Sequence, residues 1–378
     1  MTRILIAGDT CPMGKIENEF IGGQAESIIH DLLPEFERSD FSILNLECPL
    51  ISKKTPIDKD FPVLGSKIDC INGIKKLGID AVNLANNHIL DHGEDGIDST
   101  INACENNGVM YFGAGQNISA ANTPLIKTIN SEKFCFIGIA EHEFCIANEK
   151  NAGANPLNII SLVQTIKQYK NEFNHLIILI HGGKEYYQYP TPKLQELCRF
   201  LVDQGAAAVI CQHSHCIGSF ERYNDKLIVY GQGNFIFENL KRKTDMWNIG
   251  MLVSLKFKDG KIFEDFIPFI QSKDSLGAKK LSSNYEKVIL DDFYKRSKEI
   301  LSSDFVQKKW TRLCSDEKYL YASRVRGHNR FLRVLNRYTH FSDWLYSKST
   351  KLMIRNVVEC EVHREGLETL WRNKDVDF

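Results

Sequence analysis

The sequence lacks a long apolar run. No window approaches the roughly 18 to 20 uninterrupted apolar residues that cross a bilayer, so we expect no membrane-spanning helix. At the start of the chain, MTRILIAGDT, one short apolar run gives way to polar residues. A signal peptide needs a longer apolar region and a cleavage site of small residues, so the sequence predicts no export signal.

Cysteine pairs at metal-site or disulfide-framework spacing are also missing. The eleven cysteines are scattered, odd in number and without a CxxC pair, which is typical of reduced, buried thiols. The chain also has little net charge: the formal value is -1, with 25% charged and 43% hydrophobic residues. Nothing in this composition points to nucleic acid, and no such partner is expected. Together these features predict a cytoplasmic globular protein.

What is present is an alternation of strand-like and helix-like segments. Short apolar, β-branched runs predict buried strands at residues 3–7, 41–46, 81–85, 134–140, 176–180, 207–211 and 227–230. Candidate helices fall between them at residues 24–33, 96–106, 159–172 and 192–204. Such alternation indicates an α/β sheet protein. Gly108 and Gly205 follow two of the helical segments, where C-terminal caps are expected.

The character of the chain changes from about residue 281. Strand-like runs stop there, and apolar residues then recur at roughly helical spacing: Phe331, Leu332, Leu335, Tyr338, Phe341, Trp344 and Leu345. We interpret this region as a helical C-terminal appendage. The predicted domains are therefore residues 1–275, the α/β domain, and residues 276–378, the appendage.

The appendage contains a basic stretch. Residues 308–355 hold twelve Lys or Arg against Asp316, Glu317 and Asp343. Most such runs are solvated helix faces. The alternative is peripheral contact with an anionic ligand, with a membrane surface or with a partner protein.

Nearly every strand-like run ends in residues that can bind a metal or transfer a proton. The runs end in Gly8-Asp9, Asn45-Leu46-Glu47, Asn86-Asn87-His88, Glu141-His142, His181-Gly182-Gly183 and His213-Ser214-His215. The carboxyl ends of strands form the rim where ligands bind in open α/β sheets, so these side chains can converge. Singly, each has an ordinary explanation, such as a cap for Asp9 or a turn for Asn87. As a set they predict a metal centre.

This set mixes oxygen and nitrogen donors. Carboxylates, amides and imidazoles together suit Zn, Mn or Fe better than Ca or an all-sulfur site. We therefore expect a divalent-metal cofactor, with two ions.

Seven motifs follow one another in a fixed order along the chain. They are GDTCPMG, NLECPL, LANNHILDHGEDGI, GAGQN, HGGKEYYQYP, QHSHCIGSFE and VYGQGNFIF. Through this ordered set of motifs, the chain resembles the CapA family, also called the poly-γ-glutamate capsule-synthesis family. That family belongs to the calcineurin-like metallophosphatase superfamily. The resemblance covers about residues 3–270. It implies a metallophosphatase-like four-layer α/β/β/α sandwich, with two mixed β-sheets packed together and helices on both outer faces.

The resemblance also implies a ligand set and a catalytic pair. The implied metal ligands are Asp9, Glu47 as the bridging carboxylate, Asn87, His181, His213 and His215. His88 would be the acid or the group that stabilises the transition state. Asp91 would fix the tautomer of that imidazole and raise its basicity, and the alternative for Asp91 is a helix N-cap.

Some positions depart from the superfamily's pattern. Cys11 stands where a His normally follows the first Asp by two residues, so one metal would lose a ligand or gain a thiolate. Cys11 is therefore a candidate ligand or a neighbour of the ligands. Gln212 stands before His213 where Gly is common. These departures leave a metal site expected but weaken the case for ordinary phosphatase activity.

Polar and aromatic residues beside the expected ligands are candidates for substrate binding. Lys184, Glu185 and Tyr186 follow the strand-end His-Gly-Gly, and Glu141 and His142 stand at another strand end. For Tyr186 the alternative is simple packing. For Glu141 and His142 the alternative is that they hold the metal ligands in place without contacting the substrate.

The expected function is that of a metal-dependent hydrolase. It would act on a phosphorylated or anionic small-molecule or polymer precursor in capsule or cell-surface polymer biosynthesis, using the metals to activate water. The alternative is a non-hydrolytic ligase, transferase or modifying component of a polysaccharide or poly-γ-glutamate pathway that uses the same metal site. A metal-free scaffold is the third hypothesis.

Overall fold

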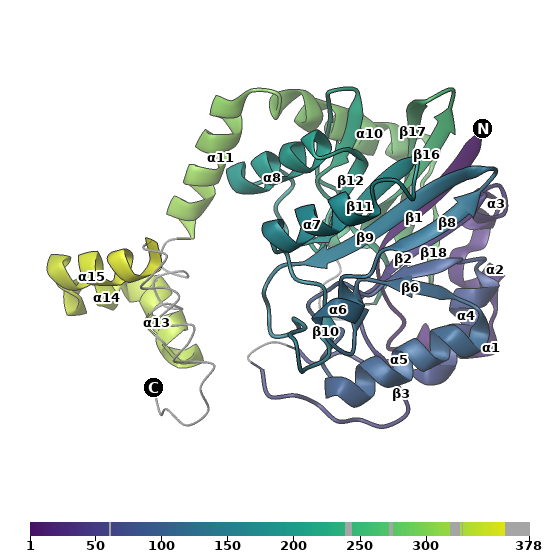
Figure 1. The fold of residues 1–378 in the computed structure, drawn as a ribbon. Coiled ribbons are helices and arrows are strands. Elements are labelled where there is room, and N and C mark those ends of the chain that lie inside the picture. Colours follow the sequence, from purple (N-terminus) through teal and green to yellow (C-terminus); the bar gives the residue numbers. More distant parts are fainter. Residues whose placement is uncertain (60–61, 239–243, 272–274, 318–325, 327, 360–378) are drawn as a thin grey trace. The chain divides into compact units, whose positions relative to one another are not determined.

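The chain divides into two units, each with its own internal contacts. The computed structural model describes residues 1–59, 62–238, 244–271, 275–317, 326 and 328–359 (Figure 1). The units are Met1–Gln307 and Lys308–Phe378.

Helix α10 (Ser283–Glu299) belongs to the first unit. It packs against strands β13 (Phe220–Tyr223) and β17 (Lys261–Gln271), which explains why the unit continues beyond the last strand. The domain boundary expected between residues 275 and 276 stays a prediction.

The first sheet is mixed. In the described part of the chain its strands are β1 (Thr2–Cys11), β2 (Phe41–Leu46), β5 (Ala81–Asn83), β6 (Met110–Phe112), β15 (Asn234–Phe237), β16 (Ile249–Lys258), β17 and β18 (Ala278–Lys280). They lie in the order β18-β17-β16-β1-β2-β5-β6, with β15 also paired to β1. β1 runs parallel to β2 and β15 and antiparallel to β16.

The second sheet has a parallel centre and antiparallel edges. Its strands are β8 (Leu125–Ile129), β9 (Glu132–Ala140), β11 (His175–His181), β12 (Ala206–Gln212), β13 and β14 (Lys226–Val229). Their order is β13-β14-β12-β11-β9-β8. Two short pairs lie outside both sheets: β3 (Leu50–Ile51) with β4 (Ser66–Lys67), and β7 (Ala114–Gly115) with β10 (Gly153–Ala154).

Apolar side chains on both faces of each sheet build the layers. Successive side chains of a strand point to opposite faces, so Ile4 and Ile6 of β1 enter the core between the two sheets. Leu5 and Ala7 face the other way, toward helices. The second sheet likewise has helices on its outer face, where Leu201 is buried. The fold is therefore the expected four-layer α/β/β/α sandwich.

Helices cover both outer faces of the sandwich. Those of the first face are α1 (Glu17–Gly22), α2 (Ala25–Ile29), α3 (Leu33–Glu37), α4 (Ile71–Lys76) and α5 (Gly93–Asn107), with the 3-10 helices η1 (His30–Leu32) and η2 (Ile68–Cys70). Those of the second face are α7 (Ile159–Tyr169) and α8 (Pro192–Asp203). Short helices α6 (Ile118–Ala121) and α9 (Asp245–Asn248) complete the connections.

Local sequence signals explain several helix ends. The Thr191 side chain accepts a hydrogen bond from the Leu194 N–H, and Pro192 occupies the first turn of α8, where its missing N–H costs nothing. Gly108 ends α5 in the left-handed region at φ 71°, as the sequence predicts. The helix expected at residues 24–33 is instead divided into α2 and η1, with α3 beginning at Leu33.

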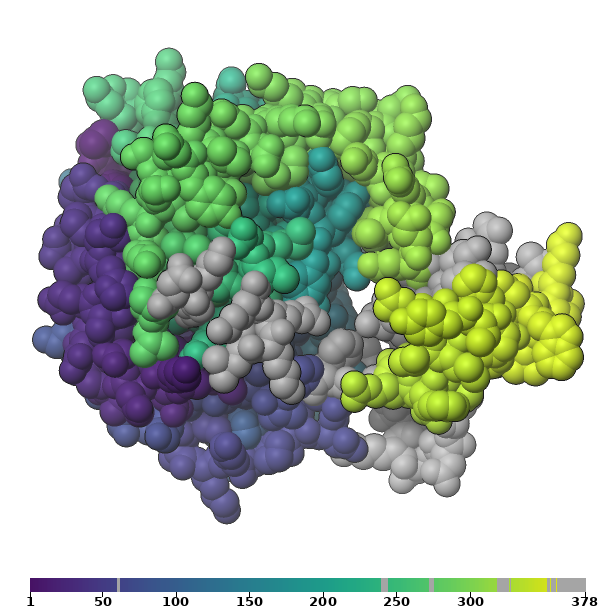
Figure 2. All heavy atoms as spheres, turned by 180° about the vertical axis from the view of Figure 1, so that it is seen from behind, coloured from purple at the N-terminus to yellow at the C-terminus, as the bar shows by residue number. Residues whose placement is uncertain are grey.

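Segments far apart in the sequence lie side by side in the first unit. Figure 2 shows purple N-terminal segments against green segments from late in the chain. The Lys280 N–H donates to Asp31 Oδ1 at 2.8 Å, and Lys280 Nζ lies 3.2 Å from Glu35 Oε1. The C-terminal part of the first unit thus closes on its N-terminal helices.

The second unit is helical, which agrees with the predicted appendage. Helix α11 (Ser303–Asp316) begins in the first unit and ends in the second, and α13 (Arg330–Thr339), α14 (Phe341–Leu345) and α15 (Lys348–Glu359) follow. In the part of the chain that the structure describes, no helix is both long and apolar enough to cross a membrane. The cytoplasmic location stays a prediction.

Candidate metal centre

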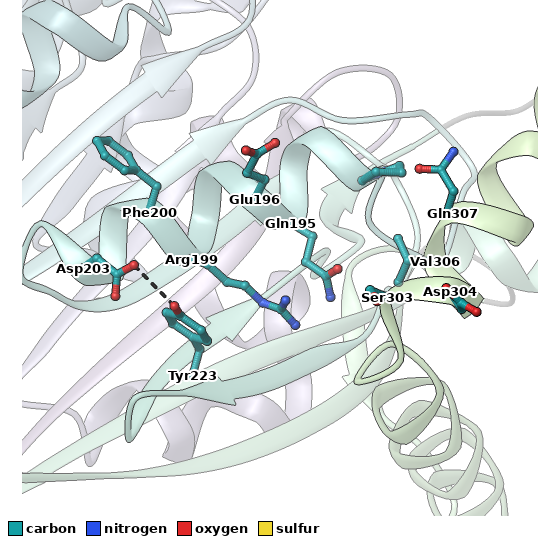
Figure 3. Close-up of a pocket in the computed structure, with 11 residues that line it drawn as sticks. Gln195, Glu196, Arg199, Phe200, Asp203, Tyr223, Ser303, Asp304, Val306 and Gln307 are labelled. Atoms are coloured by element: carbon teal, nitrogen blue, oxygen red, sulfur yellow. Dashed lines mark hydrogen bonds between the residues drawn. The ribbon is translucent and has the colours of Figure 1, made fainter.

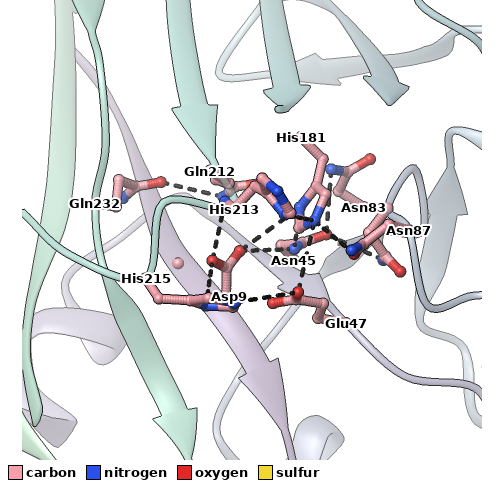
Figure 4. Close-up of polar contacts among 12 residues, drawn as sticks. Asp9, Asn45, Glu47, Asn83, Asn87, His181, Gln212, His213, His215 and Gln232 are labelled. Atoms are coloured by element: carbon pink, nitrogen blue, oxygen red, sulfur yellow. Dashed lines mark hydrogen bonds and ion pairs between the residues drawn. The ribbon is translucent and has the colours of Figure 1, made fainter. Parts of the chain in front are cut away.

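The predicted ligands come from strand ends in both sheets. Asp9 lies near the end of β1 and Glu47 directly follows β2, while His181 ends β11 and His213 directly follows β12. β1 and β2 are parallel neighbours, as are β11 and β12, so each pair brings its side chains to one edge of its own sheet. His181 Nε2 lies 3.5 Å from Glu47 Oε1, so the two edges meet. Figure 4 shows these side chains pointing toward one another.

Two groups of ligand atoms lie close enough to hold a metal ion. One consists of Glu47, His181 and His213, and the other of Asp9, Glu47 and His215. Within each group the ligand atoms lie within 4.8 Å of one another, and all these side chains are buried. Glu47 belongs to both groups, which is the arrangement expected of a bridging carboxylate.

Glu47 has the least satisfied side chain of the site. It is fully buried, and neither carboxylate oxygen has a hydrogen-bond partner in the described structure. Oε1 lies 3.5 Å from His181 Nε2 and 3.8 Å from His215 Nε2. Burial raises the pKa of Glu47 well above its usual range, and the charges of Asp9 and Glu185 raise it further. An unpaired buried carboxylate is costly, so these residues fit a bound cation.

Two of the three histidines, His181 and His213, have pKa shifts that suit metal binding. Burial lowers the pKa of His181 well below its usual range, and the neighbouring imidazoles lower it further. Burial likewise lowers the pKa of His213. Burial acts in the same direction on His215, but a hydrogen bond and the charge of Asp9 outweigh it and raise that pKa overall. Neutral imidazoles are the form that binds metals.

The loop after β12 holds its two histidines in a strained backbone. His213 and His215 have φ values of 88° and 53°, in the left-handed region that costs a non-glycine residue about 1 to 3 kcal/mol. Asp9 Oδ2 accepts from the His213 N–H at 3.0 Å, and His215 Nδ1 lies 2.9 Å from Asn234 Oδ1. The first contact holds the backbone at His213, and the second fixes the direction of the His215 ring.

Two asparagines complete the surroundings of the ligands. Asn45 Nδ2 donates to Asp9 Oδ1 at 2.8 Å and lies 3.1 Å from His181 Nδ1. Asn87 Oδ1 lies 3.0 Å from His181 Nε2, while its Nδ2 donates to Glu143 Oε2 at 2.9 Å. The amide oxygen of Asn87 therefore faces the site, as expected of a ligand.

His88 and Asp91 form the expected pair. His88 Nδ1 lies 2.7 Å from Asp91 Oδ2, and the Leu64 N–H donates to the same oxygen at 2.6 Å. Burial lowers the pKa of His88 against the opposing effect of Asp91. Asp91 is not an N-cap, because α5 begins after His92. His88 directly follows Asn87, whose Oδ1 lies 3.0 Å from His181 Nε2, so the pair lies near the ligand groups.

Lys59 is a site residue that the sequence did not indicate. Its side chain is only 2% exposed, and its Nζ forms an ion pair with Asp91 Oδ1 and lies 3.2 Å from His88 Nδ1. The Ile57 N–H donates to the Asp91 carbonyl oxygen at 3.0 Å, which holds the segment before Lys59 against the pair. No strand end marks Lys59, so the strand-end pattern could not identify it.

Asn45, Asn234 and Glu143 are further contacts outside the predicted site set. Asn45 lies two residues before Glu47 in the same motif, so its position gave a signal. Asn234 follows the apolar run at residues 227–230, a position that suits a turn equally well. Glu143, and not Glu141, contacts the amide of Asn87.

The substrate-binding candidates are only partly brought together. The Tyr186 ring lies 6.1 Å from the His215 ring, and the charge of Glu185 acts on the pKa of Glu47. Lys184 is half-buried in the same segment. Glu141 lies beside Gly182, and burial raises its pKa. His142 is exposed, which sets it apart from the buried ligands.

Cys11 lies outside both ligand groups. Its side chain is fully buried in the core between the first sheet and its helices. Burial raises the pKa of this thiol well above its usual value, and contact with Cys48 raises it further. The ten cysteines in the described part of the chain are free, and nine of them are buried. That they are reduced thiols stays a prediction.

A separate groove of about 530 Å³ lies between α8 and the start of α11 (Figure 3). Three of its polar side chains, Arg199, Asp203 and Tyr223, already have partners. Arg199 forms an ion pair with Glu221 at 2.6 Å, and the Tyr223 hydroxyl donates to Asp203 at 3.3 Å. None of the predicted ligands lines it.

The four-layer sandwich defines the fold class of this protein as metallophosphatase-like. The family of bacterial capsule synthesis proteins called PGA_cap matches residues 3–239, and the chain belongs to this family. This confirms the resemblance that the ordered motifs indicated.

Two curated relatives agree with the family match. The capsule biosynthesis protein CapA of Bacillus anthracis is 27% identical over 236 residues, which cover 60% of this chain and 57% of that protein. The PGA biosynthesis protein CapA of Bacillus subtilis is 28% identical over 223 residues, covering 57% of each. The match thus spans less than two thirds of either relative.

Among solved structures, a hypothetical protein from Thermus thermophilus is similar. It is 13% identical with a TM-score of 0.46, and the alignment covers 71% of this chain and 98% of that chain.

Proposed function

We propose that this chain is a metal-dependent hydrolase of capsule or cell-surface polymer biosynthesis, acting on a phosphorylated or otherwise anionic precursor. The cofactor would be two divalent ions of Zn, Mn or Fe. The observation that supports this most directly is Glu47, a fully buried carboxylate without a hydrogen-bond partner among the described residues, which belongs to both ligand groups. Mixed carboxylate and imidazole donors suit these metals.

The metal ligands, the residues that orient them and the His88–Asp91 pair would each have a separate role. Divalent ions held here would supply Lewis acidity, lower the pKa of a water molecule and offset the carboxylates of the site, so that it accepts an anionic substrate. Asn45 would keep Asp9 and His181 in place through its amide. His88, oriented by Asp91, would offset charge that develops on the substrate or protonate a leaving oxygen.

A non-hydrolytic ligase, transferase or modifying component is the second candidate. Two observations favour it. Cys11 replaces a metal-binding His of the superfamily and lies outside both ligand groups. The names of the curated relatives refer to biosynthesis and not to hydrolysis.

Metal content is the first test of the proposal. The purified chain is expected to carry about one to two equivalents of Zn, Mn or Fe by elemental analysis, because two ligand groups share one carboxylate. Removing the metal with a chelator should lower the melting temperature, since a ligand that binds only the folded state stabilises it. A preparation that carries no metal and binds no added divalent ion contradicts the proposal. Release of phosphate from aryl phosphates then separates hydrolysis from the second candidate.

Lys59 provides a test of how the His88–Asp91 pair is positioned. Lys59→Met removes the ion pair to Asp91 while keeping much of the side chain's length, and we expect turnover to fall about tenfold to a hundredfold because the imidazole loses its fixed position. Metal content should not change, since Lys59 is not a ligand. Lys59→Arg should restore part of the rate. Equal turnover in Lys59→Met and wild type would make this ion pair purely structural.

A further inference from the structure

Helices α13 and α14 expose apolar side chains that a folded unit normally buries. These are Phe331, Val334, Leu335 and Tyr338 on α13, and Trp344 and Leu345 on α14. Phe331 is 73% exposed, Tyr338 78% and Trp344 88%. We call these six residues the apolar face. Four of them are spaced i, i+3, i+4 and i+7, so they form one stripe along α13.

Side-chain hydrogen bonds hold the helices that carry the apolar face. The Asn329 side chain caps α13 by accepting from the Leu332 N–H at 2.9 Å. The buried Asn336 accepts from the Ser342 N–H at 3.0 Å, which ties the start of α14 to α13. The exposed stripe is therefore not the inner face of α13, since Asn336 lies on the buried side.

Positive charge adjoins the apolar face. Arg330 and Arg337 are both exposed. Arg330 lies four residues before Val334 and Arg337 three residues after it, so both are neighbours of Val334 on the helix surface. Across residues 308–355 the sequence has twelve Lys or Arg against three acidic residues. Apolar and basic groups thus occupy adjacent strips of the same helix.

We propose that the apolar face docks on the surface of a bilayer that contains anionic lipid. An amphipathic helix with aromatic residues on one side and arginines beside them lies in the interface, with its apolar side about 5 to 10 Å into the headgroup boundary. Trp and Tyr favour that depth, and Arg binds anionic headgroups. A second copy of this chain is a poorer partner, because it would bring arginines against arginines.

The lengths of the helices set the mode of contact. α13 has ten residues and α14 has five, whereas a membrane-spanning helix needs about 20. The contact would therefore be peripheral. This inference does not depend on the proposed hydrolase activity, because it concerns a different unit of the chain and is tested without substrate.

Flotation of the full chain with vesicles tests the proposal. We expect binding to vesicles of phosphatidylcholine with phosphatidylglycerol, weak binding to phosphatidylcholine alone, and weaker binding as salt is added. Arg330→Gln with Arg337→Gln should weaken binding about fivefold per arginine. Phe331→Ser with Tyr338→Ser should weaken it about tenfold or more, on vesicles of the same composition.

Matched controls come from the first unit. Ile160 on α7 is 73% exposed, like Phe331, and Lys167 and Lys170 are exposed. Ile160→Ser, and Lys167→Gln with Lys170→Gln, should leave vesicle binding unchanged, while circular dichroism checks that every variant is folded. No binding to anionic vesicles, or equal binding by the α13 variants and wild type, would overturn the proposal. So would a dimer in size-exclusion chromatography that Trp344→Ser dissolves, because the face would then bind a second copy.

Discussion

Glu47→Gln is expected to lose both divalent ions, whereas His213→Ala and His215→Ala should each lose one. The reason is that Glu47 belongs to both ligand groups and each of these histidines to only one. Elemental analysis of the three variants beside wild type measures the difference, and turnover should fall with the metal. Glutamine keeps the shape of glutamate but not its charge, so folding is preserved.

The controls for Glu47→Gln follow from burial. Because the carboxylate has no hydrogen-bond partner in the described structure, replacing it should not lower the melting temperature of the metal-free protein. Cys11→Ser should keep full metal content, since the thiol lies outside both ligand groups. A Glu47→Gln variant that retains two ions would contradict the shared-ligand arrangement. Loss of metal in Cys11→Ser would show that the Cys11 thiol is a metal ligand.

His88→Ala is expected to keep its metal and lose turnover by about a hundredfold to ten-thousandfold. His88 pairs with Asp91 and is a member of neither ligand group, so its loss removes a group that acts on substrate while the metal remains. Metal content and rate are measured on the same samples, with the first substrate found in a screen of phosphoesters and amides.

A matched control for His88→Ala lies at the far end of a strand that carries a ligand. His175 begins β11, at the opposite end of the strand from His181, and contacts Glu132 at 3.2 Å. His175→Gln should keep both metal and rate. Near wild-type turnover of His88→Ala would refute its catalytic role, and parallel loss of metal would make His88 a ligand.

The predicted strands were found because their runs are mainly apolar. In β2 every residue is buried, since helices cover one face and the second sheet the other, and four of its six residues are apolar, with Ser42 and Asn45 as the exceptions. The hairpin of β16 and β17 was not predicted. β17 has exposed and half-buried residues such as Glu264 and Asp265 among its apolar ones, and its signal is correspondingly weaker.

The sequence points to the residues of the two ligand groups because most of them follow a recognisable strand; that they bind metal stays a prediction. Asp9, Glu47 and His181 were marked by the apolar runs before them, and parallel strands bring such ends to one edge. The sequence did not show how these ligands are grouped. That Glu47 joins the His181–His213 group to the Asp9–His215 group depends on how two sheets face each other, which no local spacing encodes.

Sequence by itself determined the α/β alternation, the ordered motifs of the family and the residue types at the strand ends, because periodicity and short motifs are local properties. Only the tertiary structure decided which groups meet. Lys59 reaches the His88–Asp91 pair from a segment without regular structure, and its burial beside Asp91 depends on packing between residues about 30 positions apart. Likewise, helical spacing predicted α13, but spacing cannot tell a buried stripe from an exposed one. The structure leaves Phe331 and Tyr338 exposed because the packed side of α13 is the one that carries Asn336.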